Sequence, residues 1–138
     1  MLIQKNVTAS DSKDEGMSSD DNYTKLLPGT YTSSKQSTNY GAEALTQFNS
    51  DKTFTFSATM SMTGQTGEKT EMSFSGNGKW EINNGYLIET VENVECDELE
   101  IKQSMLQERV TKDKIIQLNQ QLLIVKTKTG ETETWTRQ

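Results

Sequence analysis

The chain has 138 residues, carries a formal net charge of −6 and is only 31% hydrophobic, so it is long enough for one domain with a small core. No apolar run approaches the roughly 18 residues that a membrane-spanning helix needs, and the acidic balance argues against a nucleic-acid-binding surface, because phosphate contacts require Lys and Arg. The sequence has no His and a single cysteine, Cys96, which excludes Ser-His-Asp and Cys-His catalysis, an internal disulfide and a four-cysteine metal site.

The first 25 residues are predicted to be a flexible tail or linker, and residues 26–138 to be the folded domain. Residues 8–22 are rich in Ser and Asp and nearly free of large apolar side chains, so they bury too little apolar surface to offset the entropy of ordering them. Residues 1–3, Met-Leu-Ile, are compatible with the cut end of a removed signal or membrane anchor, but three residues leave this open.

Residues 31–36 are predicted to form a first strand, and residues 41–47 a short helical turn. From residue 54 the chain alternates strictly, with apolar side chains on one face and Ser or Thr on the other, which is typical of a half-buried strand. A Gly-rich turn follows, and the next strand alternates in the same way up to Trp80 and Ile82. We expect Trp80 to point into the core.

Gly76 and Gly78 interrupt this second strand, which favours a bend, a bulge or a close backbone approach. Asn83-Asn84-Gly85 then predicts a tight hairpin, because Asn and Gly tolerate positive φ. Residues 97–111 break the alternation and are predicted to form a short helical insert or an irregular crossing.

Three further strands are predicted over residues 114–118, 122–127 and 132–137. Short turns between successive strands imply antiparallel up-and-down order. The predicted fold is therefore all-β: an antiparallel up-and-down β-barrel of about seven to eight strands with a short helical insert. With about seven strands counted, the two terminal strands would leave an open edge. Residues 41–47, the insert, or a partner chain would have to cover it.

Several short motifs resemble the lipocalin-like (calycin) barrels of bacteria. Leu27-Pro28-Gly29-Thr30-Tyr31 is similar to their Gly-x-Trp opening, with Tyr in place of Trp. Residues 115–118, 122–124 and 134–137 resemble the closing strands of these barrels. Residues 48–54 resemble the hairpin after the opening. In lipocalins an Arg near the last strand packs over the opening aromatic ring. The resemblance therefore implies a cation–π contact between Arg137 and Tyr31.

A narrower likeness is to periplasmic co-regulator subunits of the ToxS and VtrC type, which act with membrane-bound transcription activators in virulence regulation. The motif Gly-x-Trp-x-Ile-x-Asn-x-Tyr-Leu, which precedes an acidic insert in those proteins, matches six residues here: Gly78, Trp80, Ile82, Asn84, Tyr86 and Leu87. The resemblance implies a barrel that forms a heterodimer with a partner subunit and binds a bile salt or a lipid-like molecule.

The candidate ligand-binding residues share the apolar face of the two alternating strands. Met is flexible and polarizable, and so suits a pocket that adapts to a hydrophobic ligand; the alternative is that these side chains simply fill a small barrel. The predicted set is Phe54, Phe56, Met60, Met62, Met72 and Phe74.

No catalytic, cofactor or metal site is predicted. Cys96 lies between two acids, which disfavours a reactive thiolate, and the acidic pairs lack the spacing of a calcium loop and alternate with exposed positions. The sequence thus favours a non-enzymatic protein of the bacterial envelope or periplasm that binds a small hydrophobic ligand and a partner subunit in signaling. We expect no binding of nucleic acid, and contact with the membrane only through an anchor absent from this chain. The alternative is a filled-barrel lipoprotein or secretion-system accessory that acts only through protein contacts; a carboxylate-dependent enzyme is the least favoured class.

Overall fold

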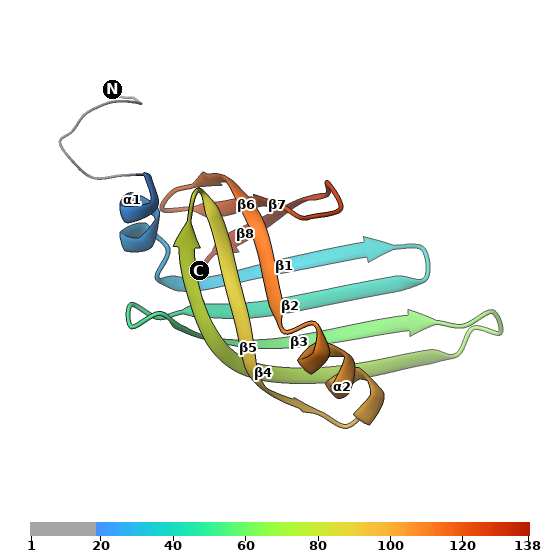
Figure 1. The fold of residues 1–138 in the computed structure, drawn as a ribbon. Helices are drawn as coiled ribbons and strands as arrows, with labels where there is room; N and C mark the ends of the chain where they lie inside the picture. Colours follow the sequence, from blue (N-terminus) through green and yellow to red (C-terminus); the bar gives the residue numbers. More distant parts are fainter. Residues whose placement is uncertain (1–18) are drawn as a thin grey trace.

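The structure, a computed structural model, describes residues 19–138 and shows eight antiparallel strands that close into an up-and-down barrel (Figure 1). This confirms the predicted all-β barrel with a helical insert. The elements are α1 (Ser19–Leu26), β1 (Gly29–Ser37), β2 (Tyr40–Phe48), β3 (Thr53–Thr63), β4 (Lys69–Asn83), β5 (Tyr86–Cys96), α2 (Leu99–Gln107), β6 (Val110–Leu118), β7 (Leu122–Lys126) and β8 (Thr132–Arg137).

The helical turn predicted over residues 41–47 is wrong, because these residues form the middle of β2. This strand pairs with β1 from Gly29↔Phe48 to Ser37↔Tyr40 and with β3 along its whole length. Its alternation is hard to recognise, since the inward positions include small Ala residues and the large apolar Leu45 points outward and is 44% exposed. Strand β2 supplies the eighth strand of the barrel.

The two terminal strands, between which the sequence predicted an open edge, pair with each other. Strand β1 meets β8 only at Tyr31↔Arg137 and Thr32↔Thr136, and beyond this point the two strands diverge. Strands β1 to β4 project past the short strands β7 and β8 (Figure 1). The barrel is therefore narrow and closed near α1 and wide at its other end.

Helix α1 packs on the closed end of the barrel, although its residues 19–25 fall within the predicted tail. Tyr23 and Leu26 contact the core, and the Asp20 carboxylate accepts hydrogen bonds from the backbone N–H groups of Asn84 and Gly85, at 2.7 and 2.8 Å. The φ angles of 54° at Asn84 and 81° at Gly85 confirm the predicted tight hairpin. The rest of the tail predicted over residues 1–25, namely residues 1–18 with the suggested anchor remnant at residues 1–3, lies outside the described residues.

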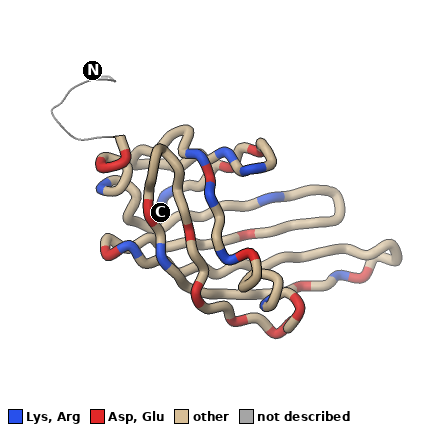
Figure 2. The backbone as a smooth tube through the Cα atoms, in the orientation of Figure 1, with Lys and Arg blue, Asp and Glu red and all other residues tan. Residues whose placement is uncertain are grey.

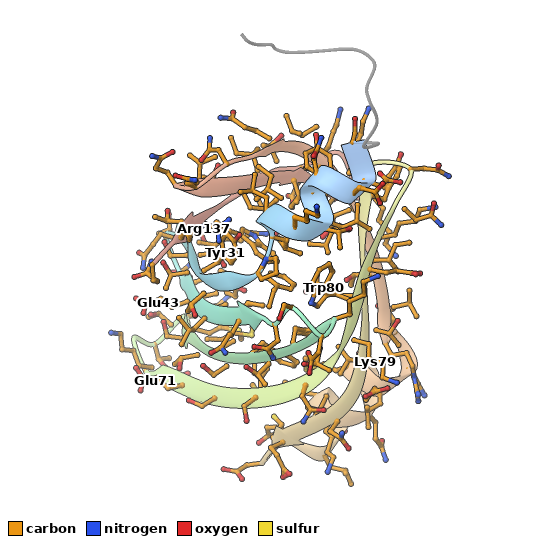
Figure 3. All side chains as sticks on the ribbon, turned by 90° about the vertical axis from the view of Figure 1, so that its left-hand side faces the viewer. Tyr31, Glu43, Glu71, Lys79, Trp80 and Arg137 are labelled. Carbon is orange, nitrogen blue, oxygen red and sulfur yellow. The ribbon has the colours of Figure 1, made fainter. Side chains whose placement is uncertain are left out.

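The core fills the half of the barrel next to α1. Figure 3, which views the barrel from its α1 side, places Tyr31 and Trp80 inside the ring of strands. Aromatic rings dominate the packing, with Phe48 edge-on to Tyr31 and to Trp80 at centroid distances of 5.7 and 6.1 Å. The buried hydrophobic residues of this cluster are Leu27, Tyr31, Phe48, Phe54, Trp80, Leu87, Ile115, Leu118, Leu123 and Val125.

Strand β4 bends sharply at Gly76 and Gly78, as predicted from these glycines. The pairing with β5 shifts between Asn77 and Gly78, which marks a bulge. A Cβ atom at Gly78 would overlap the backbone carbonyl of Thr90, and one at Gly76 would lie 2.7 Å from the Phe56 ring. The bend therefore requires residues without side chains at both positions.

We expect Gly78→Ala to lower the free energy of unfolding by roughly 1–3 kcal/mol or more, because the added methyl group meets backbone atoms that cannot move without breaking the bend. Urea denaturation measures the change. Ser75→Ala, on the outward face of the same strand, is the matched control and should change stability by less than about 0.5 kcal/mol. Equal stability of the two variants would contradict the close approach.

Candidate functional site

A cavity of about 500 Å³ occupies the wide half of the barrel, within the range of roughly 300–1,000 Å³ that small ligands fill. Its apolar wall comes from strands β2 to β5 and from Met105 of α2, and residues of β1, β6 and β8 complete the lining with polar side chains. The apolar lining residues are Ala42, Ala44, Phe54, Phe56, Ala58, Met60, Phe74, Val91 and Met105. Two larger hollows, of about 910 and 1100 Å³, are lined mostly by Ser, Thr and charged side chains.

The structure brings four of the six predicted ligand-binding residues to this cavity. Phe54, Phe56, Met60 and Phe74 line it, and Phe54 forms its floor because it is also buried in the filled half. Met62 and Met72 lie further along the projecting ends of β3 and β4, outside the lining, and Met62 is 52% exposed. The apolar face predicted from alternation is thus continuous, but the barrel encloses only part of it.

An aromatic ladder connects the filled half of the barrel with the cavity. Phe54 and Phe56 are stacked at a centroid distance of 6.1 Å, and Phe56 meets Phe74 edge-on at 6.4 Å. The missing side chain at Gly76 leaves the space that the Phe56 ring occupies. These rings give the cavity a rigid wall with little conformational entropy to lose on binding.

Three acids face inward near the other side of the cavity: Glu89 on β5 and Glu133 on β8 line it, and Asp113 on β6 lies beside them in the adjoining hollow of about 1100 Å³. Burial, together with the charges of Asp113 and Glu133, raises the pKa of Glu89 to about 8, against the opposing effect of a hydrogen bond from the Thr111 hydroxyl. Burial and the Glu133 charge also raise the pKa of Asp113. Glu89 is therefore largely protonated at neutral pH.

Only Glu133 among these three acids has a cationic partner within residues 19–138. Lys35 Nζ lies 3.1 Å from Glu133 and 3.7 Å from the exposed Glu131, and the hydrogen bond and charge of Glu133 raise the pKa of Lys35. The indole N–H of Trp135 donates to Glu133 at 3.3 Å. Glu89 and Asp113 thus leave an excess of acid at the polar side of the cavity.

The three inward-facing acids and Met105 are functional candidates that the sequence reasoning missed. Alternation contained a signal for them, since Glu89 shares a face with Leu87 and Val91, and Glu133 with Trp135. Alternation of apolar residues does not by itself mark a charged residue as inward-facing, because charged side chains are mostly exposed. The place of Met105 in the lining could not be predicted, because it depends on how α2 packs against the barrel and no local sequence pattern gives that packing.

The remaining residues considered in the sequence lie outside the cavity. Cys96 is a free, partly buried cysteine, and the acids between β5 and α2 form a red cluster in Figure 2, on the exposed connection after Cys96. Within residues 19–138 no group of three or more His, Cys, Asp or Glu side chains is arranged to hold a metal ion.

The closed end of the barrel carries the contact that the lipocalin likeness implied. The Arg137 guanidinium lies 4.8 Å from the centre of the Tyr31 ring and donates hydrogen bonds to the carbonyl oxygens of Leu26 and Pro28, at 2.7 and 2.8 Å (Figure 3). Burial raises the pKa of Tyr31 to about 12, against the opposing charge of Arg137. Arg137 therefore connects β8 to the segment that leads from α1 into β1.

Comparison with protein-family models gives no match, and no curated protein has significantly similar sequence. The fold itself, an eight-stranded antiparallel barrel, is compatible with a lipocalin-like barrel. In the part of the chain that the structure describes, neither helix has the length and apolar character needed to cross a membrane.

Proposed function

We propose that this protein binds a small hydrophobic molecule in the barrel cavity and catalyses no reaction. The observation that carries the proposal is the division of the barrel into a filled half, which provides stability, and a hollow half of about 500 Å³ with an apolar wall. A barrel that acted only as a structural unit would gain stability by filling this space, because cavities cost free energy.

The flexible side chains of the lining support a ligand of variable shape. Met60 on β3 and Met105 on α2 both line the cavity, and thioether side chains adapt to different apolar surfaces. Helix α2 has nine residues, none of them buried, so it can shift at the mouth without disrupting the core.

The test is a titration with the neutral fluorescent probe N-phenyl-1-naphthylamine. We expect saturable binding to the wild type and at least about tenfold weaker binding to Ala58→Phe, whose ring would fill the cavity. Ser57→Phe adds the same ring to the outward face of β3 and should bind as the wild type does. Absence of saturable binding, or equal binding by all three proteins, would contradict a cavity site, provided that circular dichroism shows each variant folded.

The resemblance to ToxS- and VtrC-type subunits supports a finer proposal: a lipocalin-like envelope protein of the periplasm that acts with a partner as co-regulator of a membrane-bound activator. Free strand edges favour a protein partner. In residues 19–138, the part of β4 before Phe74 has β3 on one side and no strand on the other, and β1 lacks a neighbour beyond Thr32 on its β8 side. Such edges accept an added strand.

Co-expression with the periplasmic domain of such an activator, followed by size-exclusion chromatography, tests the partner. A stable complex in which the amides of residues 69–73 gain protection from hydrogen exchange supports strand addition at β4. Separate elution of the two proteins, with unchanged exchange at both free edges, would contradict it.

A further inference from the structure

The polar side of the cavity carries more negative than positive charge. The charged residues that line the cavity are Lys35, Glu43, Glu89 and Glu133, and Asp113 lies close enough to Glu89 to raise its pKa. Glu43 is exposed at the rim, and the single lysine is already paired with Glu133 and Glu131. Among the described residues that line this cavity, no lysine or arginine is left unpaired, so an anionic head group placed here would meet carboxylates.

The three inward-facing acids come together because the barrel closes around them. Strands β5 and β6 pair directly, with Glu89 opposite Thr111 and Leu87 opposite Asp113. Glu133 belongs to β8, which is not paired with β5 or β6, and it approaches from the other side of the barrel interior. The acids therefore surround one region of the cavity instead of following one strand.

We propose that the molecule bound in this cavity is a cationic amphiphile, with an amine or quaternary ammonium head near Glu89, Asp113 and Glu133 and an apolar tail along the Phe56 and Phe74 wall. This inference rests on the proposed function, since it assigns the chemical class of ligand to the same cavity. The argument is charge complementarity: a desolvated ammonium head gains charge-assisted interactions with carboxylates, whereas a bile salt or a fatty acid would bring a further negative charge.

Binding of a cation should release a proton from Glu89. Glu89 is mainly neutral at pH 7, because burial and the charges of Asp113 and Glu133 raise its pKa. The other titratable groups that line the cavity are Lys35, Tyr40 and Glu43. The adjoining hollow, which Glu89, Asp113 and Glu133 also line, carries Lys112, Lys114, Lys126 and Lys128. Lys112, Lys114 and Lys126 occupy exposed positions that alternate with the inward-facing residues of β6 and β7. A bound ammonium group favours the Glu89 carboxylate, so affinity for the cation should increase between about pH 6 and pH 8.

The experiment compares four probes below their micelle concentrations: decyltrimethylammonium, decyl maltoside, decanoate and taurocholate. Tryptophan fluorescence reports binding, since Trp135 contacts Glu133. The variants are Glu89→Gln and Asp113→Asn, and the control is Glu81→Gln, which removes the same charge from an exposed position on β4. We expect decyltrimethylammonium to bind at least about tenfold more tightly than the neutral maltoside and the two anions.

The variants separate this inference from the proposed function. Glu89→Gln and Asp113→Asn should each weaken binding of the cation about tenfold and leave the neutral probe within about twofold, while Glu81→Gln changes neither. If the maltoside or an anion binds as tightly as the cation, or if Glu89→Gln binds the cation unchanged, the cationic ligand is wrong and the apolar cavity site stands. If none of the probes binds, both proposals fail.

Discussion

Trp80→Ala should lower the free energy of unfolding by about 3–5 kcal/mol, as for other fully buried aromatic residues. Trp80 is 2% exposed, lies edge-on to Phe48, and donates a hydrogen bond from its indole N–H to the backbone carbonyl of Asn49 at 3.0 Å. The truncation would leave a large void in the filled half of the barrel. It would also remove one of the two donors to the Asn49 carbonyl, which keeps the hydrogen bond from the Lys52 backbone N–H.

Two further variants separate packing from the hydrogen bond. Trp80→Phe keeps an aromatic ring but removes the donor, so its cost should be smaller than that of Trp80→Ala. Lys79→Ala, on the outward face next to Trp80, removes only an exposed ion pair with Glu92 at 3.7 Å and should change stability by less than about 1 kcal/mol. Urea denaturation followed by circular dichroism measures all three. A loss below about 1 kcal/mol for Trp80→Ala would contradict its role in the core.

The strands with strict alternation and the hairpins with specific turn residues could be predicted from the sequence. The residues from Phe54 to Ile82 alternate on both sides of one Gly-rich turn, and Asn84-Gly85 supplies the positive φ angles that the next turn requires. Strand β2 was missed because Ala42 and Ala44 are small and Leu45 faces outward. Small inward residues are common where a barrel must leave space, so the local signal is weakest where the cavity is built.

The candidate site was predicted only on its apolar side, for a related physical reason. Phe56, Met60 and Phe74 lie on two neighbouring strands that pair through a short turn, so alternation alone brings them together. The acids come from β5, β6 and β8, and their proximity depends on closure of the whole barrel. Burial raises the pKa of Glu89 to about 8 only in that closed arrangement, which a local pattern does not contain.

Stability should fall as the pH rises from about 5 to 8.5, because the folded protein holds a proton on Glu89 that the unfolded chain releases. The pKa of Glu89 is about 8 in the fold, against an ordinary value of 4.5. Between these values the native state binds more protons than the unfolded state, so the free energy of unfolding decreases with pH. The raised pKa of Asp113 acts in the same direction, and the total change should be about 2–4 kcal/mol.

Glu89→Gln should remove most of this pH dependence, because the amide stays neutral on both sides of the transition. The variant should match the wild type near pH 5 and be more stable near pH 8.5, where the wild type buries a second carboxylate beside Asp113. Glu81→Gln reports the effect of reducing the net charge alone. The lowered pKa of Asp51, caused by hydrogen bonds from Thr53, has the opposite sign, but it acts in more acidic solution than this range. Urea denaturation at the two pH values measures the difference, and an equal slope in the wild type and Glu89→Gln would show that Glu89 is ionised in the folded protein.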